Sequence, residues 1–515
     1  MSVTRRIAFG AGASWFSRGT TILLGLVLLP VLFRHLPKEE LGVWLLLGQS
    51  WAAMGILDLG IGFTLTRRIA LAKGKSGGDP NAPLTPETLR EIADLVEAGK
   101  RIYRVMAAGV FIVSWALGFF YLRSLELHGV SQTTVWIAWT ILCASQAVAV
   151  FASIWTCLLQ GVGYVGWDAL IATFIGAGTL LAQIIAVLCG GRLIALAIVA
   201  TCGALAQRAI TLWFSRVRRP ELFSLQGRWN PDVLRGMPSL AFRAWLTAVG
   251  TVLVFNTDQF FIASSQGAEG IPAYRAAYLA VLNLNMLAVT LATASSVFIS
   301  HLWQAGEIAA LHSVVRRNIR LGLLIILCGA SCLLILGNRI FDVWLGPGRF
   351  VGYPTLIVFV ALLTLETHGA IIMLSSRATE DEGFAICSMA GGILKITFSW
   401  ILMQRLGLLG IAVGTLVAQL LTSHWYAAYR GLRRLGIGLS EHFLRIVLPC
   451  AAIFAAGLVG NRALLQWTSS HRPILQIIEA AIFTALLFVG AFWWLVLAKS
   501  ERVRLLGCLS GSRVL

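Results

Sequence analysis

The sequence has few charged residues for its length. Of its 515 residues, 12% are Asp, Glu, Lys or Arg, whereas 58% are hydrophobic. A soluble chain of this size folds into several domains with charged surfaces, and about a quarter of its residues are charged. The composition therefore excludes a soluble enzyme, a disordered chain and a fibrous protein. It indicates a membrane protein with many spans, in which lipid is the solvent for most of the surface.

Motifs of metal and nucleotide chemistry are also missing. The nine cysteines form no CxxC pair, and the sequence contains no HExxH, no Walker A loop and no Gly-x-Ser-x-Gly turn. We expect the cysteines to be small buried residues, and we expect no catalytic site, no metal and no cofactor beyond a coupling ion, either a proton or sodium. Without a nucleotide site, the energy would come from an ion gradient or from removal of the product outside.

The sequence does contain many long apolar runs. A helix needs about 20 apolar residues to cross about 30 Å of hydrocarbon, and the runs lack the period-two alternation of barrel strands. The prediction is an all-α integral membrane protein with about fourteen transmembrane helices. They are expected near residues 10–33, 41–63, 104–122, 133–159, 167–189, 192–215, 238–264, 273–300, 319–337, 352–375, 383–404, 407–430, 442–460 and 474–497.

Acidic residues are scarce beside basic ones, with 23 Asp and Glu against 41 Lys and Arg. If both termini are cytosolic, 27 of the 41 basic residues lie on the cytosolic side of the fourteen spans and nine lie outside. This bias follows the positive-inside rule, so the net charge of +18 needs no nucleic-acid partner. Five basic residues remain within spans: Arg18, Arg208, Arg243, Arg275 and Lys395. We interpret Arg208 as a helix end.

The connections between spans are short on the outer side, which leaves no room there for a catalytic domain. The longest connection, residues 64–103, is cytosolic. It begins with a glycine- and proline-rich piece, and a helix start follows at Thr85 and Pro86. Apolar residues at helical spacing then predict an amphipathic helix near 87–104, which either lies on the inner membrane surface or is a solvated linker helix.

Two hairpins indicate an internal repeat. The first reads Leu36-Pro37-Lys38-Glu39-Glu40-Leu41-Gly42-Val43-Trp44, and the second reads Gln266-Gly267-Ala268-Glu269-Gly270-Ile271-Pro272-Ala273-Tyr274. They align at an offset of about 230 residues, each between the first two of six spans. Six spans preserve the orientation, so the repeats would be parallel. Transporters with such repeats handle substrate between the two halves.

Three segments resemble the polysaccharide-unit flippases of the multidrug/oligosaccharidyl-lipid/polysaccharide exporter superfamily. They are residues 58–70 (DLGIGFTLTRRIA), 256–262 (NTDQFFI) and 406–415 (LGLLGIAVGT). The resemblance implies two six-helix lobes in a V that faces each side alternately, and transfer of an undecaprenyl-pyrophosphate-linked glycan between leaflets of a bacterial inner membrane. The expected lobes are 1–220 and 221–435, followed by two further helices and a basic cytosolic tail in 436–515.

Five ionisable residues lie within the first two spans of each repeat. They are Arg18, Asp58, Arg243, Asp258 and Arg275. Such groups cost about 2.5–3.5 kcal/mol each at bilayer depth, so they usually face a partner or a wet cavity. Arg18 could pair with Asp58, and Asp258 with Arg275. These residues could serve the function in a cavity. The alternatives to such a role are that the pairs are purely structural, or that the arginines extend to the lipid headgroups. In the resembled family these four spans line the central cavity.

The expected cargo explains the arginines. Guanidinium groups bind phosphate oxygens bidentately and stay charged, so Arg18, Arg243 and Arg275 are the candidate pyrophosphate ligands. Aromatic faces and amides commonly hold sugars. Asn256, Asn283 and Trp245 are therefore the candidate glycan contacts.

Glu366 and Lys395 lie at similar depths in the tenth and eleventh spans. They could form a buried structural pair. Alternatively, Glu366 could be a coupling site for a proton or sodium, because a desolvated carboxylate can titrate.

Two rival functions remain. A drug exporter of the same superfamily would usually have an acidic cavity, whereas the ionisable groups within the spans here are rich in arginine. A membrane glycosyltransferase or glycan polymerase would need a sizeable outer loop. The expected partners are the lipid-linked oligosaccharide and membrane lipids, with a glycan polymerase or glycosyltransferases as possible neighbours.

Overall fold

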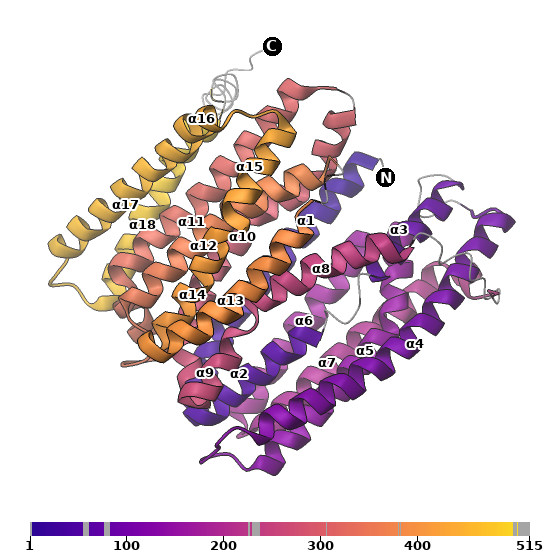
Figure 1. Ribbon diagram of the computed structural model, residues 1–515, viewed down its shortest axis with the longest axis horizontal. Coiled ribbons are helices and arrows are strands. Elements are labelled where there is room, and N and C mark those ends of the chain that lie inside the picture. The colour runs from indigo at the N-terminus through magenta and orange to yellow at the C-terminus, as the bar shows by residue number, and fades with distance from the viewer. Residues whose placement is uncertain are drawn as a thin grey trace. The chain divides into compact units, whose positions relative to one another are not determined.

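The computed structural model describes residues 3–54, 61–76, 83–224, 227–228, 237–304, 306–379, 381, 383–497 and 502 (Figure 1). This part of the chain is helical and has no β-strand, which confirms the all-α prediction. The helices are α1 Val3–His35, α2 Lys38–Ala53, α3 Ile61–Gly74, α4 Pro86–Arg123, α5 Gln132–Val162, α6 Val165–Leu188, α7 Leu193–Arg218, η2 Pro220–Phe223, α8 Met237–Phe255, α9 Asp258–Gln266, η4 Ala268–Gly270, α10 Ile271–Gln304, α11 Ile308–Leu345, α12 Tyr353–Arg377, α13 Ala385–Leu406, α14 Leu408–Leu421, α15 Ser423–Leu435, α16 Leu439–His442, η5 Phe443–Val447, α17 Leu448–Trp467, α18 Pro473–Ala491 and η6 Phe492–Val496.

The described residues contain twelve helical segments long and apolar enough to cross a membrane, all of them from α4 onward. Each coincides with one of the last twelve predicted spans. The first two predicted spans correspond to α1, in which Gly19–His35 is a shorter apolar helix, and to α2 with the start of α3. The chain is therefore a multi-pass membrane protein. The total of fourteen spans and the cytosolic termini stay predictions.

Residue chemistry explains where several helices begin and end. The Thr85 side chain accepts from the backbone N–H of Thr88 at the start of α4, and Ser131 does the same for Thr134 at the start of α5. These hydroxyls satisfy amides that have no partner in the first helical turn. Gly163 ends α5 in the left-handed conformation, at φ 108°, where a side chain would be strained.

The predicted amphipathic helix near 87–104 is the first part of α4, which continues without a break into the third predicted span. Its apolar face is buried within the protein: Ile92, Leu95 and Tyr103 are almost fully covered. The helix packs against α3, α5 and η2. The apolar stripe is therefore occupied by protein and is not left free for the membrane surface.

The structure divides into two compact units, Met1–Pro272 and Ala273–Leu515. In the first, which we call unit 1, α5 packs against α3, α4 and α7, while α6 packs against α1 and α7 (Figure 1). Glycines permit the close approach: a Cβ at Gly99 of α4 would overlap Ile154 of α5, and one at Gly161 of α5 would overlap Ile69 of α3. Small residues at interfaces are typical of packed membrane helices.

In the second, which we call unit 2, α11 packs against α12, α17 and α18, and α14 packs against both α12 and α13. Gly414 of α14 lies against the backbone of Ser399 in α13. The predicted division at residues 220 and 435, like the parallel repeat, stays a prediction.

Two glutamates at the start of α2 tie together the loops of unit 1. Glu39 accepts the backbone N–H groups of His128, at 2.8 Å, and of Gly129. Glu40 accepts the N–H of Leu193 at 2.9 Å. Both glutamates are buried. Loops that are distant in sequence therefore converge on the turn between α1 and α2.

Candidate functional site

The predicted pyrophosphate ligands are only partly visible. The side chains of Arg18 in α1 and Arg243 in α8 lie outside the described part of the structure. Arg275 is half-buried near the start of α10, with its guanidinium carbon 5.4 Å from the centre of the Tyr278 ring. This cation–π distance holds the guanidinium beside an aromatic face. The role of all three in phosphate binding stays a prediction.

The predicted ion pairs are not tested. Asp58 lies outside the described residues. Asp258 is the first residue of α9 and belongs to unit 1, whereas Arg275 belongs to unit 2. The pairs Arg18–Asp58 and Asp258–Arg275 therefore remain hypotheses.

The seventh predicted span is broken where the candidate glycan contacts begin. Residues 238–264 were expected to form one helix, but Asn256 and Thr257 interrupt it between α8 and α9. The Thr257 hydroxyl donates to the carbonyl of Leu253 at 2.7 Å and so competes with the helical backbone bonds. Broken helices at membrane depth commonly line substrate or ion sites, because irregular backbone is tolerated where it faces a cavity.

The other two glycan candidates are half-buried. Trp245 lies in α8, and its indole Nε1 is buried with no hydrogen-bond partner among the described residues. Asn283 lies in α10. Neither position contradicts a sugar contact, and neither establishes one.

Glu366 of α12 is half-buried, and Lys395 of α13 is fully buried. Both helices pack against α14. The salt bridges among the described residues of unit 2 do not include one between Glu366 and Lys395. Both the structural pair and the coupling site therefore stay predictions.

Unit 1 contains a cavity that we did not predict, in which polar side chains lie beside apolar ones. It has a volume of about 450 Å³ and lies among α3, α4, α5 and α7. Hydroxyls, amides and one guanidinium line it: Thr66, Gln146, Ser153, Thr156, Gln160 and Arg208. Small-molecule sites typically occupy about 300–1,000 Å³, so the volume is adequate for a ligand.

Arg208 is inside α7 rather than at a helix end, which corrects the interpretation from sequence. Its Nη1 donates to the Thr156 hydroxyl of α5 at 2.6 Å. Nearby, Gln160 donates to Oδ2 of the buried Asp168 in α6 at 2.8 Å. Three helices therefore contribute to one polar cluster, in which Asp168 is buried and the other side chains are half-buried.

A sequence signal for this cavity existed and was missed. Gln146, Ser153 and Gln160 recur at seven-residue spacing in an otherwise apolar run, which places them on one face of a helix. The stripe was missed because its side chains are polar but uncharged, and site candidates were sought mainly among the charged residues within spans.

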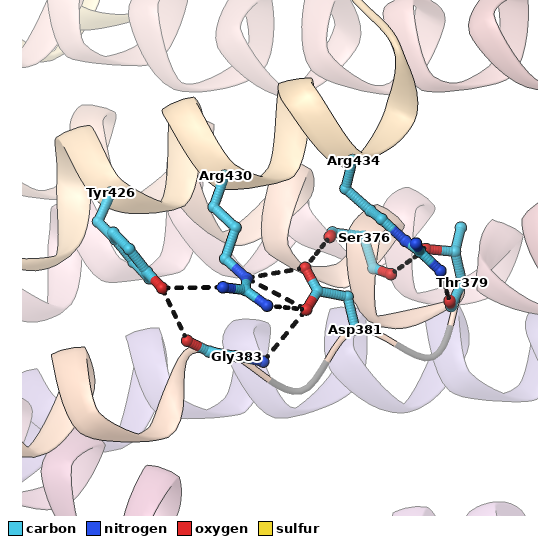
Figure 2. Close-up of polar contacts among 7 residues, drawn as sticks. All are labelled: Ser376, Thr379, Asp381, Gly383, Tyr426, Arg430 and Arg434. Atoms are coloured by element: carbon cyan, nitrogen blue, oxygen red, sulfur yellow. Dashed lines mark hydrogen bonds and ion pairs between the residues drawn. The ribbon is translucent and has the colours of Figure 1, made fainter.

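A second polar cluster joins the α12–α13 connection to α15 in unit 2. Figure 2 shows the Asp381 carboxylate facing Arg430, whose Nη2 lies 2.6 Å from Oδ1 and whose Nε lies 3.0 Å from Oδ2. The Ser376 hydroxyl also donates to Oδ2, at 3.0 Å. Hydrogen bonding from Arg430 holds the pKa of Asp381 below its ordinary value.

Further contacts extend this cluster along α15. Arg434 donates to the hydroxyl and the carbonyl of Thr379, at 3.1 and 2.9 Å, and Tyr426 donates to the carbonyl of Gly383 at 3.2 Å (Figure 2). The cluster satisfies its own donors and acceptors, so its geometry indicates a structural clamp rather than a ligand site.

No family model and no curated protein sequence matches the chain. Several solved structures match in fold. The lipid II flippase MurJ in an inward closed conformation has a TM-score of 0.66 and 16% identity, covering 94% of this chain and 98% of its own. An inward-facing multidrug resistance MATE family transporter has a TM-score of 0.61 and 14% identity, covering 84% and 96%. A MOP superfamily transporter from Pyrococcus furiosus has a TM-score of 0.60 and 14% identity, covering 84% and 95%. The chain therefore has the fold of the MOP superfamily transporters.

Proposed function

We propose that the protein is a flippase that moves an undecaprenyl-pyrophosphate-linked oligosaccharide from the cytosolic to the outer leaflet by alternating access. The observation that carries this proposal is the extent of the similarity. The match to the lipid II flippase spans 94% of this chain, whereas the drug exporter match spans 84%. The similarity to the lipid II flippase thus accounts for more of this chain's length, which supports a flippase of a lipid-linked molecule.

The arginines supply the chemistry that this cargo requires. A pyrophosphate head must cross a slab of low dielectric, where an unpaired charge is costly. Arg18, Arg243 and Arg275 would bind the phosphate oxygens, while the lipid tail stays in the bilayer. The break between α8 and α9 beside Asn256 supports a substrate path along α8, because such breaks commonly line transport sites.

The alternative function is an ion-coupled exporter of drugs or other small molecules. The similarity to MATE transporters supports it. The arginines within the spans disfavour it, because cationic drugs would be repelled. In the flippase proposal, the protein resides in a bacterial inner membrane, where a glycan polymerase or glycosyltransferases would supply or consume the cargo, and a proton or sodium gradient would drive transport.

Reconstitution into vesicles tests the proposal. We expect the purified protein to expose a labelled lipid-linked oligosaccharide to an external glycan-modifying reagent. Arg18→Ala or Arg243→Ala should abolish this exposure at equal protein levels. Arg405→Ala is the matched control, because Arg405 is exposed at the end of α13. Transport of cationic dyes without movement of the glycan lipid would favour the exporter, and full activity of both alanine variants would remove these arginines from the mechanism.

A further inference from the structure

The cavity of unit 1 offers hydrogen-bonding groups that the protein itself leaves available. The side chains of Gln146 and Thr66 have no hydrogen-bond partner in the part of the chain that the structure describes, and both line the cavity. Ser153 donates to the carbonyl of Ala149 at 2.9 Å, which leaves its oxygen able to accept. Because polar groups at membrane depth are costly unless they are satisfied, this exposed set indicates a polar ligand.

The charges beside the cavity compensate one another. Arg208 lines it, and Asp168 is 93% buried behind Gln160. Asp168 Oδ1 has no hydrogen-bond partner among the described residues. The guanidinium would repel a lone cation, and the carboxylate behind Gln160 offsets the attraction of the guanidinium for a lone anion. The lining therefore favours a neutral ligand that both donates and accepts hydrogen bonds.

The polar stripe is also elongated. From Gln146 to Gln160 is fourteen residues along α5, or about 21 Å at 1.5 Å per residue. Amide groups each offer donors and an acceptor, and hydroxyl groups do the same. A row of such groups complements a row of ligand hydroxyls.

We propose that the unit 1 cavity binds neutral sugar units of the lipid-linked cargo, with Gln146 and Thr66 as direct contacts and Arg208 as the anchor of the lining. This assignment rests on the proposed flippase function, but it concerns a different part of the cargo. The arginines of α1 and α8 would bind the pyrophosphate, and the polar face of α5 would bind the glycan. Recognition of head and glycan would then be separable.

Two lipids, one with and one without the glycan, distinguish binding of the sugar from binding of the pyrophosphate. Binding of the lipid-linked oligosaccharide and of undecaprenyl pyrophosphate without sugar is measured on the purified full chain. The wild type should bind the oligosaccharide lipid more tightly. Gln146→Ala should weaken that binding about three- to tenfold, the effect of losing one or two neutral hydrogen bonds, and leave binding of the sugarless lipid unchanged. Arg18→Ala should weaken both.

Ser145→Ala is the matched control, because Ser145 is the neighbour of Gln146 on α5 and does not line the cavity. Thermal unfolding checks that each variant is folded, and Thr66→Ala gives a second reading of the site. Equal loss for both lipids in Gln146→Ala, or no loss for either in both Gln146→Ala and Thr66→Ala, overturns the sugar site. A wild type that binds neither lipid overturns the flippase function itself.

Discussion

Gly42 of α2 lies directly against the carbonyl oxygen of Ala268 in η4, where a Cβ would overlap the oxygen. These residues belong to the two hairpins that the sequence aligns as a repeat. Both Gly42 and Ala268 belong to unit 1. The first turns of the two predicted repeats thus touch through a glycine, which explains why no larger residue stands there.

Gly42→Ala should destabilise the protein by about 1–3 kcal/mol, the usual cost of overpacking. Gly48→Ala is its control, because Gly48 is in the same helix and a Cβ there meets nothing within 4 Å. That control should be neutral or stabilising by up to about 1 kcal/mol, since alanine favours the helix. Thermal unfolding of both variants decides. Equal stabilisation by both substitutions would contradict the contact.

Glu39→Gln should lower the free energy of unfolding by about 1.5–3 kcal/mol, the range for hydrogen bonds to a charged group. An amide presents one oxygen, whereas the carboxylate accepts from both His128 and Gly129. Glu126→Gln is the matched control, because Glu126 is exposed in the same loop as His128. Denaturation curves of the two variants would coincide if Glu39 did not hold this loop.

Asp381→Asn should destabilise the protein at neutral pH but not in strong acid. The pKa of Asp381 is lower in the folded state because of its bonds from Arg430. Its stabilisation is therefore fully present above the unfolded-state pKa of about 4 and is lost as the pH falls through the folded-state value. At pH 7 we expect a loss of about 1–2 kcal/mol.

Unfolding measured across pH tests this relation. The wild-type and Asp381→Asn curves should converge at low pH. Arg433→Gln serves as the control, since Arg433 is on the same helix and its side chain is exposed and bonded to Tyr429. A pH-independent difference between wild type and Asp381→Asn would refute the assignment.

Exchange of charges between Glu366 and Lys395 should fail to restore transport. The described structure contains no salt bridge between them, and a carboxylate that couples an ion must stay where the ion binds. The measurement is ion-driven transport in vesicles by Glu366→Gln, Glu366→Lys and the double variant Glu366→Lys/Lys395→Glu. Normal transport by the double variant would argue for a simple structural pair.

Lysine at position 18 or 243 should restore transport only partly relative to alanine. Lysine keeps the charge but loses the bidentate geometry with which arginine binds phosphate. Initial rates for Arg18→Lys and Arg243→Lys are the measurement. Wild-type rates with lysine would show that charge alone suffices.

The helical fold was predictable because lipid imposes a simple rule on the sequence. Every backbone group must be satisfied within the segment, so about 20 apolar residues in succession predict a helix. The break at Asn256 was missed although four polar residues, 256–259 (NTDQ), stand there, because the span was predicted from the apolar residues on both sides of them. The surroundings of residues 87–104 in α4 were not predictable either. An amphipathic pattern indicates that one face of a helix is covered, but it does not show whether lipid or protein covers that face.

Some candidate site residues could be predicted from the sequence, whereas the cavity in unit 1 was found only in the structure. Charged residues such as Arg18 and Glu366 were conspicuous in apolar runs because each charge within a span is costly. The stripe of Gln146, Ser153 and Gln160 was overlooked because its residues are uncharged, and the cavity that it lines forms only where α3, α4, α5 and α7 pack together.

The sequence by itself determined the class of the protein, because scarce charge and long apolar runs require a helical membrane protein. The orientation that the basic residues predict stays a prediction. Only the tertiary structure decided which polar groups meet. Local periodicity shows the face of a helix on which a residue lies, but the neighbour of that face depends on packing between distant segments. Thus Arg208 reaches Thr156, and Glu39 reaches His128, through contacts that no single stretch of sequence specifies.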